Sequence, residues 1–403
     1  MLAVLAVGAL GVTWAALRHP VAPAAPPAPS ATASSSASAA PGPTPGPTTT
    51  APEPAPSATP ADPLAGWTLE EKVGQLFVVG LDLTDPQQVS RDLVSQRHVG
   101  NVFLHGRSSA GVTAVRAVVD DVTSLATAAT THGTPMLVAV DQEGGRVQSL
   151  TGPGFSTIPS AAQQATLAPD ELRARARQWG DELAAAGVSL DLAPVMDLVP
   201  ASSAAANPPI GALDRGYGAT AASVTSHAGA FLEGMRAAGV GVSIKHFPGL
   251  GRVTANPDAT AGVTDTLTSA DDESVGVFRS GIAAGADTVL MSTAVYSLLD
   301  PSAPAAFSPA VVTGLLRGTL GFDGVVITDD LSGAEQVAAW SPGDRAIDAI
   351  AAGCDLVLFS KEPQVAPAAV EAVVARASSD PAFAARVDES ARRVLALKAA
   401  LEL

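Results

Sequence analysis

One short junction recurs four times in this chain and strongly limits the folds open to it. Each copy is an Ala-Ala-Gly triplet that ends a helix-like stretch, at residues 185–187, 237–239, 283–285 and 351–353. Glycine is the residue that most readily adopts the left-handed conformation found just past a helix end. A strand-like run follows each triplet: Val188–Leu192, Val240–Ile244, Thr288–Met291 and Leu356–Phe359. Repeated junctions of this kind indicate an α/β protein with a parallel sheet.

Four further apolar runs extend the pattern to eight strands. They are Leu76–Leu81, Val99–Leu104, Met136–Val140 and Gly324–Ile327. Pro309, after Ser308, predicts a helix that begins there, because proline suits the first helical position. Eight strand–helix units over about 340 residues fit a single (β/α)8 barrel of the TIM type with long loops, since a plain barrel needs ~250 residues. An open, doubly wound sheet is the alternative.

Polar side chains stand where several of these strands end. The run Gly324–Ser332 has the pattern of a buried strand and stops at two adjacent carboxylates, Asp329 and Asp330. An unpaired charge inside a buried strand costs several kcal/mol, so this pair has to lie where the strand emerges. Each polar residue alone could be a helix cap or a satisfied core residue. Together they indicate an active site at the carboxyl rim of the barrel; the others are Asp141, Asp191, Asp197, Lys245 and His246.

The composition argues against several classes of function. The 403 residues carry 23 Lys and Arg against 39 Asp and Glu, and the net charge of −16 argues against nucleic-acid binding. Cys354 is the only cysteine and the six histidines are scattered, so we expect no disulfide and no metal site. The glycines of residues 249–251 lack the third glycine of a dinucleotide-binding motif. We therefore expect no cofactor, and carboxylates and cations on one rim suit a polyhydroxylated substrate and acetal cleavage.

The first 62 residues have a different composition from the rest. Residues 2–17 are apolar, but they fall short of the roughly 20 residues that a membrane span needs. We predict that residues 1–19 are a signal peptide or a membrane anchor. Residues 20–62 are almost wholly Pro, Ala, Ser, Thr and Gly, which predicts a disordered linker. The protein should then be exported and either released or held at the outer face of the cytoplasmic membrane by residues 2–17, with the barrel in residues 63–403.

Three sequence blocks resemble the signature blocks of the family 3 glycoside hydrolases. They are Asp141–Val147 (DQEGGRV), Lys245–Gly251 (KHFPGLG) and Gly324–Ser332 (GVVITDDLS). The most similar branch is the bacterial exo-β-N-acetylglucosaminidases, which remove terminal N-acetylglucosamine from cell-wall fragments. The resemblance covers roughly residues 65–400. It implies a TIM barrel, a carbohydrate substrate and, we expect, a monomer.

The resemblance also implies roles for individual residues. Asp329 matches the family nucleophile, which attacks the anomeric carbon in the retaining pathway. Asp330 would support it. The residues that match those holding the sugar hydroxyls are Asp141, Arg215, Lys245 and His246.

The loop after the second block departs from the family pattern. The branch takes its general acid/base from an Asp-x-His pair; Asp258 matches the Asp, but Thr260 replaces the His. Leu250 also replaces a common histidine of the block. Threonine is not a general acid near neutral pH, and losing proton donation costs ~10²–10⁴ in rate. Asp258 is the first candidate for the acid, with Asp265 and His105 as others. A sugar-binding member with impaired catalysis is the alternative, and hydrolysis and phosphorolysis both remain open.

Overall fold

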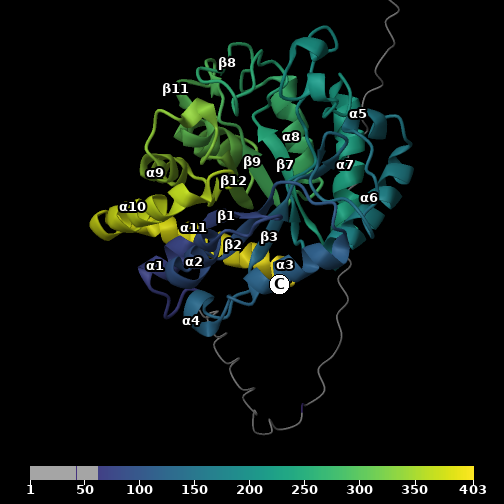
Figure 1. Cartoon of the computed structure of the whole chain (residues 1–403). Coiled ribbons are helices and arrows are strands. Elements are labelled where there is room, and N and C mark those ends of the chain that lie inside the picture. The colour runs from purple at the N-terminus through teal and green to yellow at the C-terminus, as the bar shows by residue number, and fades with distance from the viewer. Residues whose placement is uncertain (1–41, 43–61) are drawn as a thin grey trace, which may run out of the picture. The chain divides into compact units, whose positions relative to one another are not determined.

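The computed structural model describes residue 42 and residues 62–403 of the chain (Figure 1). The predicted signal peptide or anchor and nearly all of the predicted linker lie outside these residues and stay predictions. Within residues 62–403, no helix combines the length and the apolar character that crossing a membrane requires.

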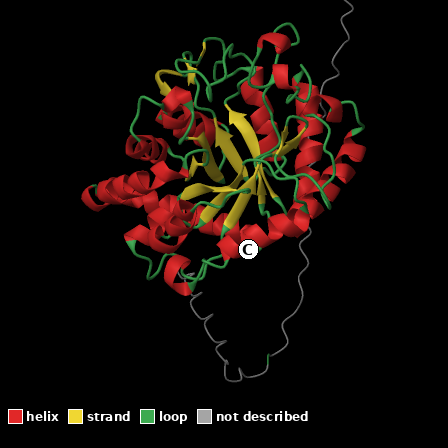
Figure 2. Cartoon of the chain, in the orientation of Figure 1, coloured by secondary structure: helices red, strands yellow, loops and turns green. Residues whose placement is uncertain are grey.

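Eight parallel strands close into a barrel surrounded by helices (Figure 2). Around the barrel the hydrogen-bonded order is β1-β13-β12-β9-β7-β6-β3-β2. This closure confirms the predicted (β/α)8 barrel and excludes the open sheet, and every predicted strand overlaps an observed one. The barrel strands are β1 (Phe77–Asp82), β2 (Asn101–His105), β3 (Leu137–Val140), β6 (Leu190–Asp191), β7 (Gly241–Phe247), β9 (Thr288–Met291), β12 (Val325–Asp330) and β13 (Leu356–Phe359).

Helices connect the strands in the order that a (β/α)8 barrel requires, and short elements decorate the loops. The α-helices are α1 (Leu69–Gly74), α2 (Gln88–Arg97), α3 (Val112–Thr123), α4 (Ala128–Thr131), α5 (Ala161–Gln164), α6 (Pro169–Ala185), α7 (Ala221–Ala237), α8 (Glu273–Ala283), α9 (Pro342–Ala352), α10 (Ala366–Ser379) and α11 (Pro381–Ala400). The 3₁₀ turns are η1 (Ala204–Ala206), η2 (Gly211–Leu213), η3 (Ala305–Phe307), η5 (Glu335–Val337) and η6 (Pro363–Val365). Two small sheets lie outside the barrel and contain β4 (Gln142–Gly144) and β5 (Val147–Gln148), and β8 (Thr264–Asp265), β10 (Val295–Tyr296) and β11 (Asp300–Pro304).

The four Ala-Ala-Gly triplets end helices as predicted. Helices α6, α7, α8 and α9 end at or just before the second alanine of a triplet. The glycines that follow have φ values of 83°, 80°, 91° and 120°, at Gly187, Gly239, Gly285 and Gly353. These angles lie in the region that side chains with a Cβ seldom adopt, which explains why glycine stands at each junction.

The helix before the Asp-Asp strand differs from the prediction in one respect. It is a π-helix, η4 (Ala310–Thr319), and Pro309 occupies its N-cap instead of its first turn. Ser308 accepts at its Oγ from the backbone N of Val311, so the chain is held at this end by a side chain as well.

Helix α11 closes the amino-terminal end of the barrel. Its side chains Val394 and Leu397 pack in one cluster with residues that fill the barrel interior. Lys398 Nζ donates to Gln75 Oε1 at 2.7 Å and to the carbonyl of Gly100 at 2.9 Å, just before strands β1 and β2 begin. A substrate can therefore enter the barrel only from the opposite, carboxyl-terminal end.

The single cysteine belongs to the core. Cys354 is completely buried just before β13, as predicted, and its burial raises the pKa of the thiol to about 12. A thiol in these surroundings stays protonated and unreactive at neutral pH.

Candidate active site

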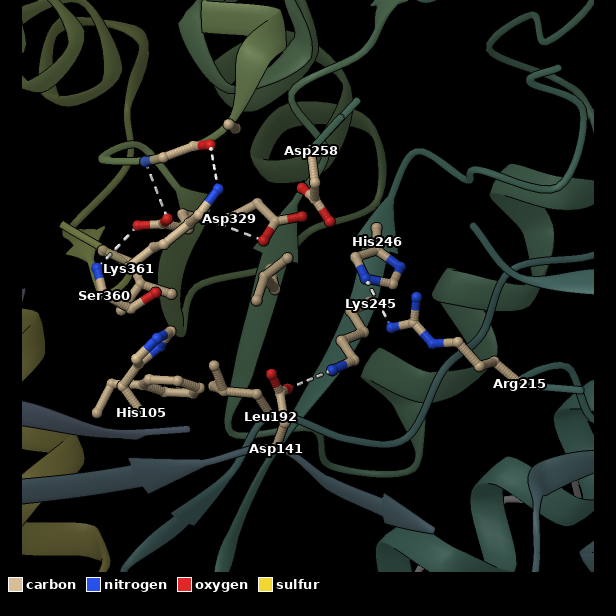
Figure 3. A pocket seen from close by; sticks show the side chains of 16 residues that line it. His105, Asp141, Leu192, Arg215, Lys245, His246, Asp258, Asp329, Ser360 and Lys361 are labelled. Carbon is tan, nitrogen blue, oxygen red and sulfur yellow. Dashed lines mark hydrogen bonds and ion pairs between the residues drawn. The ribbon is translucent and has the colours of Figure 1, made fainter. Parts of the chain in front are cut away.

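A cavity of about 250 Å³ opens at the carboxyl end of the barrel strands (Figure 3). All six residues that the sequence singled out for catalysis or sugar binding line this one cavity. They come from four strand ends or the loops after them, and they are Asp141, Arg215, Lys245, His246, Asp258 and Asp329. The remaining wall consists of Phe103, His105, Leu192, Leu290, Asp330, Gly333, Ala334, Leu358, Ser360 and Lys361.

Asp329 lies at the end of β12, with its carboxylate toward the cavity (Figure 3). Its pKa is raised to about 6, mainly by burial and also by the nearby charge of Asp258, against the opposing effects of His246 and Lys245. At neutral pH Asp329 is still mainly ionised, as a nucleophile must be.

Asp258 reaches the same cavity from the loop after β7. Its side chain points toward Asp329 (Figure 3). The carbonyls of Pro257 and Asp258 accept hydrogen bonds from the backbone N of Gln336 and of Glu335, at 3.0 and 3.3 Å. This loop is thus joined to the loop after the Asp329 strand before any sugar is bound.

The neighbour of Asp329 has a different task. Asp330 Oδ1 accepts from the backbone N of Ser332 and Ser360, at 3.1 and 2.8 Å, and Oδ2 accepts from the backbone N of Gly333 at 3.0 Å. With so many donors, this carboxylate fixes the turn beside Asp329 and the end of β13. Asp330 is a supporting residue, in line with the sequence interpretation.

Four charged side chains form an alternating cluster on the other side of the cavity. Lys245 Nζ lies 2.6 Å from both Asp141 Oδ1 and Glu143 Oε1. Arg215 donates to both oxygens of Glu143, through Nε at 2.9 Å and Nη2 at 2.7 Å. Two cations are thus balanced by two carboxylates in a nearly buried array, which keeps the hydrogen-bonding groups in fixed positions.

The electrostatics of this cluster favour the charged forms of Glu143, Lys245 and Arg215. Burial opposes ionisation of Glu143, but the charges of Arg215 and Lys245 outweigh it and lower the pKa of Glu143 to about 2. Burial likewise disfavours the ammonium of Lys245, and the carboxylates of Asp141 and Glu143 reverse this and raise its pKa. A sugar hydroxyl placed here meets fixed donors and acceptors.

A shift of register in β7 lets two consecutive side chains reach the cavity. Neighbouring residues of a regular strand point to opposite faces of the sheet. The pairing of β7 with β9 is irregular between Lys245 and Phe247, and both Lys245 and His246 line the cavity. Such an irregularity redirects a side chain next to a functional site.

His246 is oriented by a buried carboxylate. Its Nδ1 lies 2.7 Å from Asp197 Oδ2, while Asp197 Oδ1 accepts from the backbone N of His246 and of Leu250, at 3.2 and 2.7 Å. On the other side of the ring, Nε2 lies 3.4 Å from Nη2 of Arg215, which can only donate. We assign the tautomer with hydrogen on Nδ1 from these partners, so that Nε2 is the acceptor.

The structure separates the other sequence candidates for the acid. Both carboxylate oxygens of Asp265 accept hydrogen bonds within their own turn, from Leu267 N and Thr268, and Asp265 does not line the cavity. His105 does line it, at the end of β2. Thr260 is exposed and is not part of the cavity wall. Asp258 and His105 therefore remain as titratable candidates.

Sequence reasoning did not foresee the roles of two residues that hold the site together, although it had placed Asp197 among the polar residues of the rim. Glu143 bridges Lys245 and Arg215, and Asp197 orients His246, although the sequence analysis assigned neither a role. The spacing of Asp141 and Glu143, two positions apart in an extended segment, was the available signal, because such residues share one face. Asp191, which the sequence placed among the polar residues of the rim, does not line the cavity: it is fully buried, burial raises its pKa to about 8, and its Oδ2 has no partner among residues 62–403.

Within residues 62–403, no three His, Cys, Asp or Glu side chains are grouped so as to hold a metal ion. The cavity wall instead provides carboxylates, cations and two imidazoles.

A comparison with family models and a comparison with curated proteins agree on the family of this chain. The family model described as the glycosyl hydrolase family 3 N-terminal domain matches residues 68–397. A β-hexosaminidase of Stenotrophomonas maltophilia (strain R551-3) is 33% identical over 309 residues, which cover 75% of this chain and 88% of the relative.

Two solved structures extend the likeness to three dimensions. A β-N-acetylhexosaminidase from Beutenbergia cavernae is 60% identical, with a TM-score of 0.82 over 82% of this chain and 98% of the other. A family 3 β-N-acetylglucosaminidase from a Paenibacillus species is 32% identical, with a TM-score of 0.75 over 83% of this chain and 63% of the other.

Proposed function

The chain belongs to glycosyl hydrolase family 3 and is a glycosidase, and from that premise we propose that it is an exported exo-β-N-acetylhexosaminidase. Its substrate would be a glycan derived from the cell wall, with β-linked N-acetylglucosamine or a related sugar at the end. The observation that carries the proposal is the pairing of Asp329 and Asp258 in one cavity whose opposite wall is the Lys245–Glu143–Arg215 cluster.

The first half-reaction forms a covalent intermediate. Asp329 attacks the anomeric carbon and forms an ester bond to it, while the bond from that carbon to the leaving-group oxygen breaks. Asp258, carrying the proton, gives it to the departing oxygen so that the leaving group departs as an alcohol. This assignment is supported by the side chain of Asp258, which lines the same cavity and points toward Asp329 (Figure 3).

The second half-reaction reverses these roles. Asp258, now ionised, takes a proton from water as the water oxygen attacks the anomeric carbon, and the ester bond to Asp329 breaks. Two displacements at the same carbon return its original configuration. The β-anomer of the free sugar is therefore the expected first product.

The charged cluster would hold the sugar that is cut. Lys245, Arg215 and the Nδ1-protonated His246 present donors and one ring acceptor, and Asp141 presents an acceptor. Their mutual ion pairs fix these groups before the sugar arrives, which reduces the entropy lost on binding. The identity of the sugar rests on the names of the relatives alone.

Two measurements test this function. The purified protein should release the aglycone from an aryl β-N-acetylglucosaminide, and proton NMR during the first minutes should show the β-anomer. The α-anomer as first product would exclude the double displacement. Replacing Asp258 by Asn should slow an alkyl glycoside far more than a dinitrophenyl glycoside, whose leaving group needs no proton; the loss on the alkyl substrate should be ~10²–10⁴-fold.

A sugar-binding protein with impaired catalysis is the second candidate, and Thr260 is the observation that favours it. If neither substrate is turned over while N-acetylglucosamine still binds, measured by calorimetry, that candidate is correct. Phosphate in place of water as acceptor would instead show as a sugar 1-phosphate product.

Export belongs to the proposal as well. It is supported by the apolar residues 2–17 and the Pro- and Ala-rich residues 20–62. Fractionation of cells that produce the full chain should find it outside the cytoplasm, free or with the membrane. A wholly cytoplasmic protein with an intact N-terminus would contradict this part.

A further inference from the structure

A single glutamine closes the base of the loop segment that carries Asp258. The backbone N of Gln336 donates to the carbonyl of Pro257 at 3.0 Å. Its side chain pairs with both main-chain groups of Val263: Oε1 accepts from the backbone N at 2.8 Å, and Nε2 donates to the carbonyl at 3.3 Å. Residues 258–262 thus form a short exposed segment whose two ends are attached to one buried residue, at Pro257 through the backbone of Gln336 and at Val263 through its side chain.

The same glutamine lies on the loop that follows Asp329. Gln336 is in η5, between the nucleophile strand β12 and helix α9, and its neighbour Glu335 donates its backbone N to the carbonyl of Asp258. From this geometry we propose that Gln336 is a positioning residue, which holds the Asp258 loop against the nucleophile loop so that Asp258 faces Asp329. The inference rests on the proposed role of Asp258 as the acid/base.

The bond pattern gives the physical reason for a glutamine here. A primary amide offers one donor and one acceptor, and so it satisfies the N–H and the carbonyl of Val263 as a neighbouring strand would. Methionine has a similar length but cannot make either bond, and it leaves the buried N–H of Val263 unsatisfied, while the carbonyl still accepts from Val295 N at 3.0 Å. The segment should then move outward, and a displacement of about 1 Å can cost ~10²-fold in rate.

This attachment also explains which residue of the segment can act. Thr260, at the position where the family resemblance implies a histidine, lies in the middle of the exposed segment and outside the cavity wall, whereas Asp258 lines the cavity and lies next to the attachment point. A loop fixed at Pro257 and Val263 presents Asp258 without a large closing movement.

The test compares Gln336→Met with Asp258→Asn and with the double variant, on a dinitrophenyl and an alkyl β-N-acetylglucosaminide. Gln336→Met should lose about 10²-fold in kcat on the alkyl substrate and much less on the dinitrophenyl one. In the double variant the loss should equal that of Asp258→Asn alone, because a misplaced acid and an absent acid fail in the same step. Equal losses on both substrates, or losses that multiply, would overturn the inference.

A matched control is available in Gln148. It is also buried, and its side chain makes the same kind of bonds to main-chain groups, to Ser156 O at 2.8 Å and from Ile158 N at 3.0 Å, in a loop without Asp258. Gln148→Met should leave the ratio of the kcat values on the alkyl and the dinitrophenyl substrate unchanged. If it changes the ratio as Gln336→Met does, the effect is general loosening and the inference fails.

A second variant keeps the test open if Gln336→Met does not fold. Glu335 is the first residue of η5 and follows Ala334, whose ψ is 123°, so proline fits at position 335. Glu335→Pro removes the N–H that donates to Asp258 O, together with the exposed side chain of Glu335, and it should show the same selective loss on the alkyl substrate, to a smaller degree. No selective loss in a folded Glu335→Pro protein counts against the inference.

A pH profile distinguishes failure of this inference from failure of the proposed acid. Asp258 raises the pKa of Asp329 through its charge, so moving or neutralising Asp258 should shift the acid limb of kcat/KM to lower pH, even with the dinitrophenyl substrate. If Asp258→Asn shifts the limb and Gln336→Met does not, the positioning role is wrong. If Asp258→Asn lacks the leaving-group effect, the acid assignment is wrong. The other charged or titratable groups in the wall, unchanged in these variants, are His105, Asp141, Arg215, Lys245, His246, Asp330 and Lys361.

Discussion

Nδ1 of His246 and Oδ2 of Asp197 lie 2.7 Å apart in a part of the barrel rim from which solvent is excluded. Asp197 has no contact with the cavity, yet it decides which ring nitrogen of His246 carries hydrogen. The free nitrogen, Nε2, can then accept from Arg215 or from a sugar hydroxyl. Asp197, which does not line the cavity itself, therefore determines whether His246 presents a hydrogen-bond acceptor to the cavity.

Replacing Asp197 by Asn should reverse the tautomer of His246. The amide nitrogen can only donate to Nδ1, which moves the ring hydrogen to Nε2, where it meets the donors of Arg215. We expect kcat/KM to fall about 10- to 100-fold, the equivalent of one hydrogen bond to a charged group. Nitrogen NMR of labelled histidine would report the tautomer directly.

Asp265→Asn is the control for that change. Asp265 is also buried and accepts two backbone N–H groups and one side-chain donor, but its partner is the hydroxyl of Thr268, which can accept as well as donate. Its replacement should leave kcat/KM nearly unchanged. A similar loss in both variants would show that only loop stability is affected.

The buried cluster predicts a specific acid lability. The pKa of Glu143 is about 2 when folded, against 4.5 for an ordinary Glu, so its contribution to stability is complete above pH 4.5 and is lost as the pH falls toward 2. The shift corresponds to about 3 kcal/mol in the free energy of unfolding. Urea unfolding of Glu143→Gln should therefore lack this part of the pH dependence. If the free energy of unfolding depends on pH equally steeply in Glu143→Gln and in the wild type, the low pKa of Glu143 is wrong.

Much of this architecture was predictable, and the limits have a physical cause. The helix-to-strand junctions, such as Ala186-Gly187, are local signals because each depends on the φ of one glycine. Asp329 and Lys245 were identifiable because charge at the end of a buried strand has few explanations. The partnership of Glu143 with Arg215, and of Gln336 with Val263, depends on which loops meet in space. The pattern of a single sequence does not reveal which distant loops come into contact.

Asp191 should destabilise the protein at neutral pH. Its folded pKa is about 8 against 3.8 for an ordinary Asp, so the folded state keeps a proton that the unfolded state releases, and stability falls as the pH rises from 3.8 to 8. Asn cannot ionise and can keep the bond that Asp191 Oδ1 accepts from Gln142 N. Asp191→Asn should raise the free energy of unfolding at pH 7, by up to about 4 kcal/mol. The gain should vanish below pH 4, and a gain that persists there would point to packing instead.

The nucleophile gives the sharpest prediction for activity. Only ionised Asp329 can attack, so kcat/KM for an aryl glycoside should fall on the acid side with an apparent pKa near 6. Asp329→Ala should abolish turnover, because the other carboxylate at that strand end, Asp330, is held by backbone N–H groups of the turn, while the melting temperature stays near that of the wild type. Added azide should partly restore turnover of a dinitrophenyl substrate by attacking from the vacated side, giving the glycosyl azide of inverted configuration. Full activity in Asp329→Ala, or azide product of retained configuration, would show that the attacking group lies elsewhere, since a small anion can replace only the carboxylate whose place it takes.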